Sequence, residues 1–162
     1  MMKSLAIDSS TLIILSKLNY LDKALEFFEE IEVPLGVLKE VELKDDEVKI
    51  KSREMLDSKR LKREDIDVEF PFLGRGESSA IRLALDKDKV ICLDDKKARR
   101  LSSDLGLTVI GTLSILRKIY KVGELKERPE ELYFKLRALG FYIDYALFSK
   151  IFAPANTPPE TP

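Results

Sequence analysis

Two short apolar runs that end in aspartate are the strongest fold signal in the chain, Leu5-Ala6-Ile7-Asp8 and Val90-Ile91-Cys92-Leu93-Asp94-Asp95. Each run has the length and the apolar composition of a buried strand. A helical pattern follows each of them, at residues 11–18 and 96–105. Strands that alternate with helices predict a parallel sheet covered by helices on both faces.

The same reasoning assigns the rest of the chain. The predicted strands are residues 3–7, 31–33, 90–93 and 108–110. The predicted helices are residues 11–18, 21–28, 34–43 with Pro34 in the first helical position, 77–85, 96–105, 111–120, 128–139 and 143–152. Residues 44–67 are densely charged and predict one or two solvent-facing helices. We expect a single α/β domain over residues 1–152 with a central parallel sheet of four to five strands, and a flexible proline-rich tail at 153–162.

Composition excludes several function classes. The 162 residues contain no His and one Cys, so serine and cysteine triads lack their imidazole and a zinc site lacks its usual ligands. The single Cys92 cannot form an internal disulfide, which favours a reducing cytoplasm. No apolar run approaches the length of a membrane span. The net charge of −1 gives no overall attraction for nucleic acid, and the 35% of charged residues suggests a heat-adapted source.

Acidic residues follow the predicted strands. Asp8 ends the first strand, Asp94 and Asp95 end the third, Glu77 begins a helix, and Glu40 lies in the helix after the second strand. Ligands of open parallel sheets bind at the carboxyl ends of the strands, and carboxylates gathered there repel each other unless a cation lies between them. The pattern therefore predicts a site for a hard divalent cation such as Mg²⁺. Taken alone, each acid is better explained by a structural role: Asp8 and one of the paired aspartates as helix caps, Glu77 at a helix N-terminus and Glu40 on a solvated surface.

Other motifs are less specific. Gly74-Arg75-Gly76 lacks the Lys-Ser/Thr of a phosphate loop and predicts a tight turn into a helix. The basic residues after the third strand suit a solvated helix face or phosphate binding: Lys96, Lys97, Arg99 and Arg100. Three aromatic residues could stack on bases or lie in the core: Phe70, Phe72 and Tyr120.

Five ordered segments resemble the PIN-domain superfamily, most closely an uncharacterised prokaryotic branch related to VapC toxins. They are Ile7-Asp8-Ser9-Ser10, Val33 to Val41, Gly74 to Ile81, Leu93 to Arg99 and Gly106 to Leu113. The resemblance covers residues 3–152. It implies a PIN-like three-layer α/β/α fold whose acids meet at one edge of the sheet.

The resemblance also implies roles for individual residues. The four positions that match the family's catalytic acids are Asp8, Glu40, Glu77 and Asp95. The implied metal ligands are Asp8, Glu77, Asp94 and Asp95. The predicted substrate-binding residues are Ser10, which matches a small polar residue that supports the first acid in the family, and three basic residues near the acids that would position phosphates, Arg75, Lys96 and Lys97. Two alternatives stay open, Asp94 against Asp95 as the principal ligand and Glu42 against Glu40.

For function, the resemblance implies Mg²⁺- or Mn²⁺-dependent cleavage of RNA by an endoribonuclease. It also implies a homodimer and a co-expressed antitoxin protein that holds a toxin inactive. One alternative is a PIN-like subunit that binds RNA or protein without cleavage. Another is a phosphoacceptor or phosphatase domain, but such domains need paired early acids or Asp-x-Asp after the first strand, and Asp8-Ser9-Ser10 provides neither.

Overall fold

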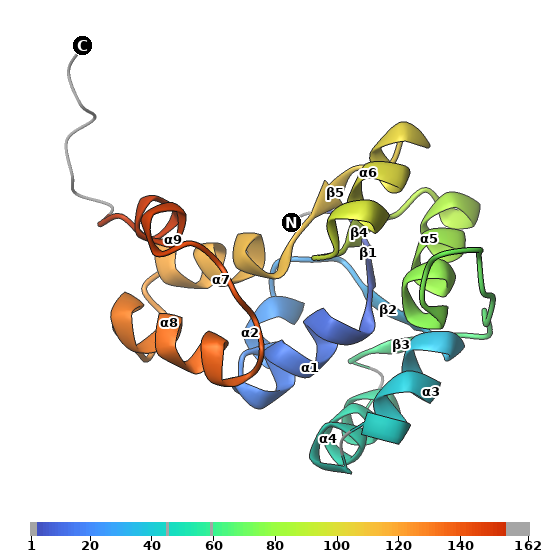
Figure 1. Cartoon of the computed structure of the whole chain (residues 1–162). Coiled ribbons are helices and arrows are strands. Elements are labelled where there is room, and N and C mark those ends of the chain that lie inside the picture. Colours follow the sequence, from blue (N-terminus) through green and yellow to red (C-terminus); the bar gives the residue numbers. More distant parts are fainter. Residues whose placement is uncertain (1–2, 45, 59, 155–162) are drawn as a thin grey trace. The chain divides into compact units, whose positions relative to one another are not determined.

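The structure is a computed structural model that describes residues 3–44, 46–58 and 60–154. The chain forms two compact units, Met1–Thr112 and Leu113–Pro162. The elements of the first unit (Figure 1) are β1 Leu5–Ile7, α1 Ser9–Lys17, α2 Leu21–Leu25, β2 Ile31–Pro34, α3 Leu35–Lys44, α4 Asp46–Asp57, β3 Lys62–Glu64, α5 Arg75–Lys87, β4 Val90–Cys92, α6 Lys96–Asp104 and β5 Val109–Ile110. Helix α7, Thr112–Lys121, begins at the last residue of this unit, and α8, Pro129–Ala138, and α9, Tyr145–Ile151, follow in the second.

The five strands form one parallel sheet in the order β3-β2-β1-β4-β5. This confirms the predicted α/β class and its parallel sheet. The chain extends the sheet from β1 towards β3 and then returns to add β4 on the other side of β1. The direction of winding therefore changes between β1 and β4, which is where open parallel sheets bind their ligands. Ile7 pairs with Cys92, so both strands end at the same level.

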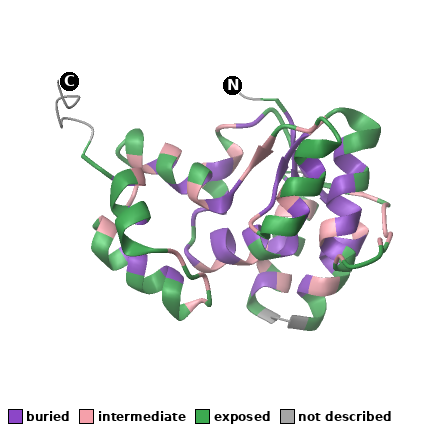
Figure 2. Cartoon of the chain, turned by 45° about the horizontal axis from the view of Figure 1, so that its top comes forward, coloured by how far each residue is buried: buried purple, intermediate pink, exposed green. Residues whose placement is uncertain are grey.

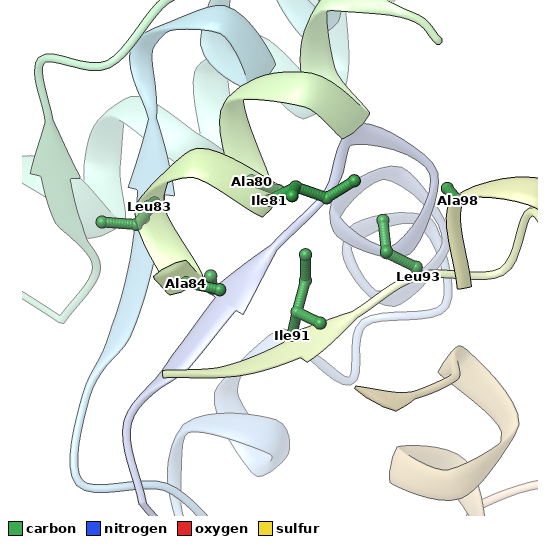
Figure 3. Close-up of a cluster of buried hydrophobic side chains, with 8 residues drawn as sticks. Ala80, Ile81, Leu83, Ala84, Ile91, Leu93 and Ala98 are labelled. Carbon is green, nitrogen blue, oxygen red and sulfur yellow. The ribbon is translucent and has the colours of Figure 1, made fainter. Parts of the chain in front are cut away.

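Helix α5 covers one face of the sheet and packs on β1, β2 and β4. Its apolar residues recur at helical spacing and share one buried hydrophobic cluster with Ile91 and Leu93 of the β4 segment (Figure 3), to which α5 contributes Ala80, Ile81, Leu83 and Ala84. Helix α1 lies on the opposite side of the sheet (Figure 1). In Figure 2 the buried residues run along the central strands, which are β1, β2 and β4, and along one side of the helices of this unit. The sheet is thus fixed from both faces and its strand ends are held in register.

Two predictions of local structure are wrong. Residues 62–64 form the edge strand β3, although Lys62-Arg63-Glu64 has no apolar alternation. An edge strand needs neighbours on one side only, and its charged side chains discourage pairing with another chain. Pro34 does not begin a helix; it ends β2, where it pairs with Glu64, and α3 begins at Leu35. The other predicted helices and strands are present with shifts of a few residues at their ends.

Near the amino ends of the strands, Glu32 of β2 is buried with its side chain 1% exposed. Its carboxylate oxygens lie 3.3 Å from the Nζ atom of Lys89, 3.4 Å from that of Lys62 and 3.8 Å from that of Lys87. Lys87 also contacts Glu64 at 2.6 Å, so this ion network joins the end of α5 to β2 and β3. A buried carboxylate is tolerated in a sheet when cations surround it in this way.

The second unit is helical and has an aromatic core. The Phe148 and Phe152 rings stack with centroids 4.5 Å apart, and the Tyr133 ring meets Phe148 at 5.3 Å. Within the described residues, every helix is too short or too polar to cross a lipid bilayer. The domain boundary at residue 152 stays a prediction, and residues 155–162 of the predicted tail lie outside the described residues.

Candidate functional site

Asp8 follows β1 directly and is 3% exposed. Its carboxylate caps α1 by accepting a hydrogen bond of 3.0 Å from the backbone N–H of Thr11. The capping role expected for an acid before a helix is therefore real. Asp8 nevertheless forms no ion pair with a lysine or arginine of the described chain, so hydrogen bonding from Thr11 is what offsets the burial of its carboxylate there.

Asp94 lies two residues beyond β4, the strand that neighbours β1. Its Oδ2 atom accepts hydrogen bonds from the hydroxyl of Ser10 at 3.1 Å and from that of Thr112 at 2.5 Å. Its Oδ1 atom accepts a further bond of 2.9 Å from the backbone N–H of Thr112. Three donors from two other segments thus fix this half-buried carboxylate at the carboxyl end of the sheet.

A chain of buried hydroxyls continues from this carboxylate into the sheet. The Oγ1 atoms of Thr112 and Thr11 lie 2.9 Å apart, and Thr11 Oγ1 is 3.4 Å from the Sγ atom of Cys92. Burial raises the pKa of the Cys92 thiol, which agrees with its prediction as a small buried residue. Sequence reasoning missed Thr11 and Thr112. The available signal was that Thr112 follows the strand at 109–110, so its hydroxyl comes to the same sheet edge as the acids.

Glu77 is half-buried in the first turn of α5 and acts on Asp8 electrostatically. The pKa of Asp8 is raised from 3.8 to about 7, chiefly by burial and next by the charge of Asp94, with a smaller contribution from Glu77. The bond from Thr11 opposes this rise only in part. The structure therefore brings Asp8, Asp94 and Glu77 together, and their negative charges disfavour one another in the absence of a cation.

Glu40 reaches the same region from α3. Its Oε1 atom accepts a hydrogen bond from the backbone N–H of Gly76, at the beginning of α5. A Cβ atom at Gly76 would approach both Glu40 Oε1 and Ser9 Oγ to within 3.0 Å, so a side chain there would have to displace them. A Cβ atom at Gly74 would lie 4.0 Å from the Oε1 atoms of both Glu40 and Glu77. Glu40 and Glu77 thus face the same glycine-rich entry to α5.

Two further acids lie elsewhere. Asp95 is exposed and caps α6, where its Oδ2 atom accepts a bond of 2.9 Å from the backbone N–H of Ala98. Glu42 contacts Arg53 at 3.4 Å and lines a cavity of about 740 Å³ between α3, α4 and β3. Asp94, rather than Asp95, is the member of the pair that lies beside Asp8, and Glu40, rather than Glu42, contacts α5.

The predicted substrate-binding residues have different surroundings. Ser10 donates to Asp94 and not to Asp8. Arg75 pairs with Asp67 at 3.2 Å. Lys96 and Lys97 are exposed in the first turn of α6, and the Lys97 ammonium lies 5.7 Å from the centroid of the Phe72 ring. Arg99 is only partly exposed and donates a bond of 2.8 Å to the Leu93 carbonyl, so it is not part of a solvated basic face.

The donor set suits a hard divalent cation in its chemistry. Carboxylate oxygens are the ligands that Mg²⁺ and Mn²⁺ prefer, and the buried Ser9 hydroxyl beside Glu40 has no hydrogen-bond partner in the described residues. Within residues 3–44, 46–58 and 60–154, however, no three acidic, imidazole or thiol groups are gathered closely enough to coordinate an ion as they stand. The side chains therefore suit a divalent cation in their chemical type and in the repulsion between their charges.

Comparison with known proteins places this geometry in context. The family model DUF3368, described as a PIN domain, matches residues 4–157. Among solved structures, the chain is similar to a PilT N-terminus domain protein from the hyperthermophilic archaeon Sulfolobus solfataricus P2, with 17% sequence identity and a TM-score of 0.42. That match covers 78% of this chain and 97% of the other. No curated protein matches the chain.

Proposed function

Because the chain belongs to the PIN-domain family DUF3368, we propose that it is a Mg²⁺- or Mn²⁺-dependent endoribonuclease whose site is formed by Asp8, Asp94 and Glu77. PIN domains are generally metal-dependent nucleases. The finer assignments of metal, RNA and individual residues are our proposal and rest on the geometry of this chain.

One observation supports the proposal above the others. Asp8 and Asp94 follow two adjacent parallel strands at the point where the sheet reverses its direction of winding, and Asp94 is held there by Ser10 and Thr112. A carboxylate needed only to cap a helix does not require three donors from elsewhere in the chain. Convergence at this edge is instead typical of a ligand site in an open parallel sheet.

Each residue has a proposed role. Asp8, Asp94 and Glu77 would hold the cation, which when bound supplies Lewis-acid activation of water and of the phosphodiester. Ser10 and Thr112 orient Asp94 by donating to its oxygens. Glu40, fixed by the Gly76 N–H, would orient water or assist a second ion. Lys96 and Lys97 would bind RNA phosphates beside the site.

Some predictions rest on the resemblance alone. These are a toxin role, an antitoxin protein as partner, a homodimeric state and a cytoplasmic location. An alternative function is an RNA- or protein-binding PIN-like subunit without catalytic activity. The two functions differ in whether RNA is cleaved and whether a chelator prevents cleavage.

The test is incubation of the full chain with total RNA and Mn²⁺, with and without EDTA. We expect cleavage that EDTA abolishes. Asp8→Asn should reduce the rate by more than about 100-fold, because a charge that stabilises the reacting centre is lost. Asparagine also caps helices, so α1 should be retained. The matched control is Asp104→Asn, at an exposed acid near the end of α6, and it should cleave like the wild type.

The outcomes separate the alternatives. If Asp8→Asn is folded by circular dichroism and cleaves RNA like the wild type, the assignment of this site is wrong. If the wild-type chain binds RNA but does not cleave it with Mg²⁺ or Mn²⁺, the non-catalytic function is favoured.

A further inference from the structure

The segment before α5 presents one large apolar side chain to solvent at the edge of the acidic site. Phe72 is 91% exposed. Its backbone has a φ of 66°, in the left-handed region that bulky residues rarely adopt. Exposure of a phenyl ring and a left-handed backbone are both unfavourable, and strained residues of this kind are concentrated at functional sites.

The surrounding chain fixes this arrangement. The backbone N–H of Phe70 donates to the Ser78 hydroxyl at 2.9 Å, and the same hydroxyl donates to the Gly74 carbonyl at 2.8 Å. The Phe70 and Leu73 side chains pack against the buried cluster under α5. The residues on both sides of Phe72 are therefore anchored in the first unit, which keeps the Phe72 ring in solvent.

Phe72 is near the beginnings of both helices that contribute to the site, α5 and α6. Only two residues, and thus at most about 7 Å of chain, separate it from Gly74, whose Cβ position faces Glu40 and Glu77. From α6, the Lys97 ammonium lies 5.7 Å from the centre of the Phe72 ring, within the range of a cation–π contact. A π face and a cation therefore lie together, two residues along the chain from the glycine that faces Glu40 and Glu77.

We propose that Phe72 and Lys97 form a base-binding position beside the site, in which Phe72 stacks on an unpaired base of the substrate and Lys97 contacts the adjoining phosphate. This inference rests on the proposed nuclease function and adds Phe72 as a substrate-binding residue. Base–aromatic stacking tolerates any sequence, because every base has a π face. The bases of a duplex are already stacked on one another and cannot reach the ring.

The surroundings of Phe72 favour nucleic acid over a protein partner. On the two helices that flank this segment, the large hydrophobic residues Leu85 of α5 and Leu101 of α6 are only 39% and 37% exposed, against 91% for Phe72. An apolar protein-docking surface needs a contiguous patch of several such residues. A single ring beside Lys97 suits a polyanion that carries aromatic bases.

The test measures binding without cleavage. A fluorescein-labelled single-stranded RNA and its duplex are titrated with the full chain in EDTA at low salt, by fluorescence anisotropy. Phe72→Ala should weaken binding of the single strand by about 5- to 100-fold, the range expected for one lost base stack, and should leave duplex binding unchanged. Phe72→Trp should bind the single strand like the wild type.

Two variants serve as controls. Phe72→Leu keeps apolar bulk without a π face and should bind as weakly as Phe72→Ala. Phe134→Ala removes another exposed phenyl ring, 68% exposed on α8, and should not change binding. Thermal melting of each variant establishes that it is folded. An RNA with 2-aminopurine in place of one base should lose fluorescence on the wild type and not on Phe72→Ala.

The results distinguish this inference from the proposed function. If Phe72→Ala binds the single strand with wild-type affinity, base stacking is wrong, whether or not the chain cleaves RNA. If Phe72→Leu restores wild-type affinity, base stacking is also wrong, and Phe72 is an apolar docking residue instead. If Phe72→Ala loses affinity and Phe72→Trp retains it, base stacking is supported. That result stands even if the wild type fails to cleave RNA with Mn²⁺; in that case only the nuclease assignment is wrong.

Discussion

Asp94 and Asp95 are neighbours in the chain, yet their carboxylates accept hydrogen bonds from different parts of the structure. Asp94 accepts hydrogen bonds from Ser10 and Thr112 beside Asp8, whereas Asp95 accepts one from Ala98 at the beginning of α6. The first set of contacts joins three separate segments at the sheet edge. The second is local and is satisfied by any good capping residue.

Substitutions of the two aspartates test whether Asp94 acts in the site and Asp95 only caps α6. Asp94→Asn should lower RNA cleavage by more than about 100-fold, because it removes a charge next to Asp8 while keeping the size of the side chain. Asp95→Asn should keep nearly full activity, because asparagine caps α6 as well as aspartate does. Asp95→Ala should lower the free energy of unfolding by about 1 kcal/mol. Single-turnover cleavage rates and urea unfolding measure these effects, and the reverse pattern of activities would make Asp95 the ligand.

The acidic residues of the site could be predicted from the sequence, but the residues that donate hydrogen bonds to them could not. Asp8 was expected at the sheet edge because it follows an apolar strand, and the structure has it there. The doubled aspartate left the register open, since either residue can cap a helix. Thr112 lies 18 residues from Asp94, and only the pairing of β4 with β5 brings it close. Contacts that depend on sheet order are not visible in local patterns.

At the level of secondary structure, the beginning of α5 determines the position of Glu40. The Gly76 N–H donates to the Glu40 carboxylate, and α3 packs chiefly on α5. Gly76 leaves no space for a side chain, because its Cβ position is already occupied by Glu40 and Ser9. Gly74 has open space by comparison. Two glycines separated by one residue are therefore expected to differ in their tolerance of substitution.

Gly76→Ala should displace the Glu40 carboxylate rather than unfold the chain, since the obstructing atoms are the ends of flexible side chains. Alanine also favours a helix over glycine by about 1 kcal/mol, which offsets part of the steric cost. We expect a melting temperature close to that of the wild type and a clear loss of RNA cleavage. Gly74→Ala is the matched control and should keep its activity. Equal activities for the two variants would mean that Glu40 has no part in the reaction.

The elements that were predicted correctly have strong apolar patterns, and the errors fall where the pattern is absent. The strand β3 carries Lys62-Arg63-Glu64, which resembles a solvated helix or loop when read alone. Its strand conformation comes from pairing with β2 and from the contacts of Lys62 with Glu32 and Glu64. The fixed φ of Pro34 suits both a first helical turn and an edge of a strand, so the local sequence does not distinguish the two. Tertiary pairing decided both cases.

In the first unit, buried carboxylates at the two ends of the sheet are surrounded by charges of opposite sign. At the amino ends, Glu32 has three lysines within 4.0 Å. At the carboxyl ends, Asp8 has two acids as neighbours and no ion pair with a cation in the described chain. Both carboxylates are buried, so burial alone does not distinguish them. The carboxyl end, where Asp8 is buried beside other acids, is the one expected to gain most from a bound cation.

The different charges around these carboxylates determine whether the stability of the fold rises or falls with pH. The pKa of Asp8 is raised to about 7, so its contribution to stability is fully present below pH 3.8 and is lost as the pH rises through about 7. The pKa of Glu64 is lowered, chiefly by its hydrogen bond with Lys87, so its contribution is present above pH 4.5 and is lost as the pH falls through the folded-state pKa. The metal-free chain should therefore be most stable in mildly acidic solution.

Thermal and urea unfolding between pH 4.5 and 9 test this prediction. In EDTA, wild-type stability should decrease from pH 5 to pH 8, because only the unfolded chain ionises Asp8 freely. The displacement of its pKa from 3.8 to about 7 sets an upper value of about 4 kcal/mol for this loss. Asp8→Asn has no charge to bury, so it should be more stable than the wild type at pH 8 and nearly equal to it at pH 4.5. Mn²⁺ should restore the wild type at pH 8 and have little effect on Asp8→Asn, because a cation that binds only the folded chain stabilises it by mass action. A wild-type profile that is flat in EDTA, or a Mn²⁺ effect of the same size in both proteins, would show that Asp8 is not the carboxylate that the cation compensates.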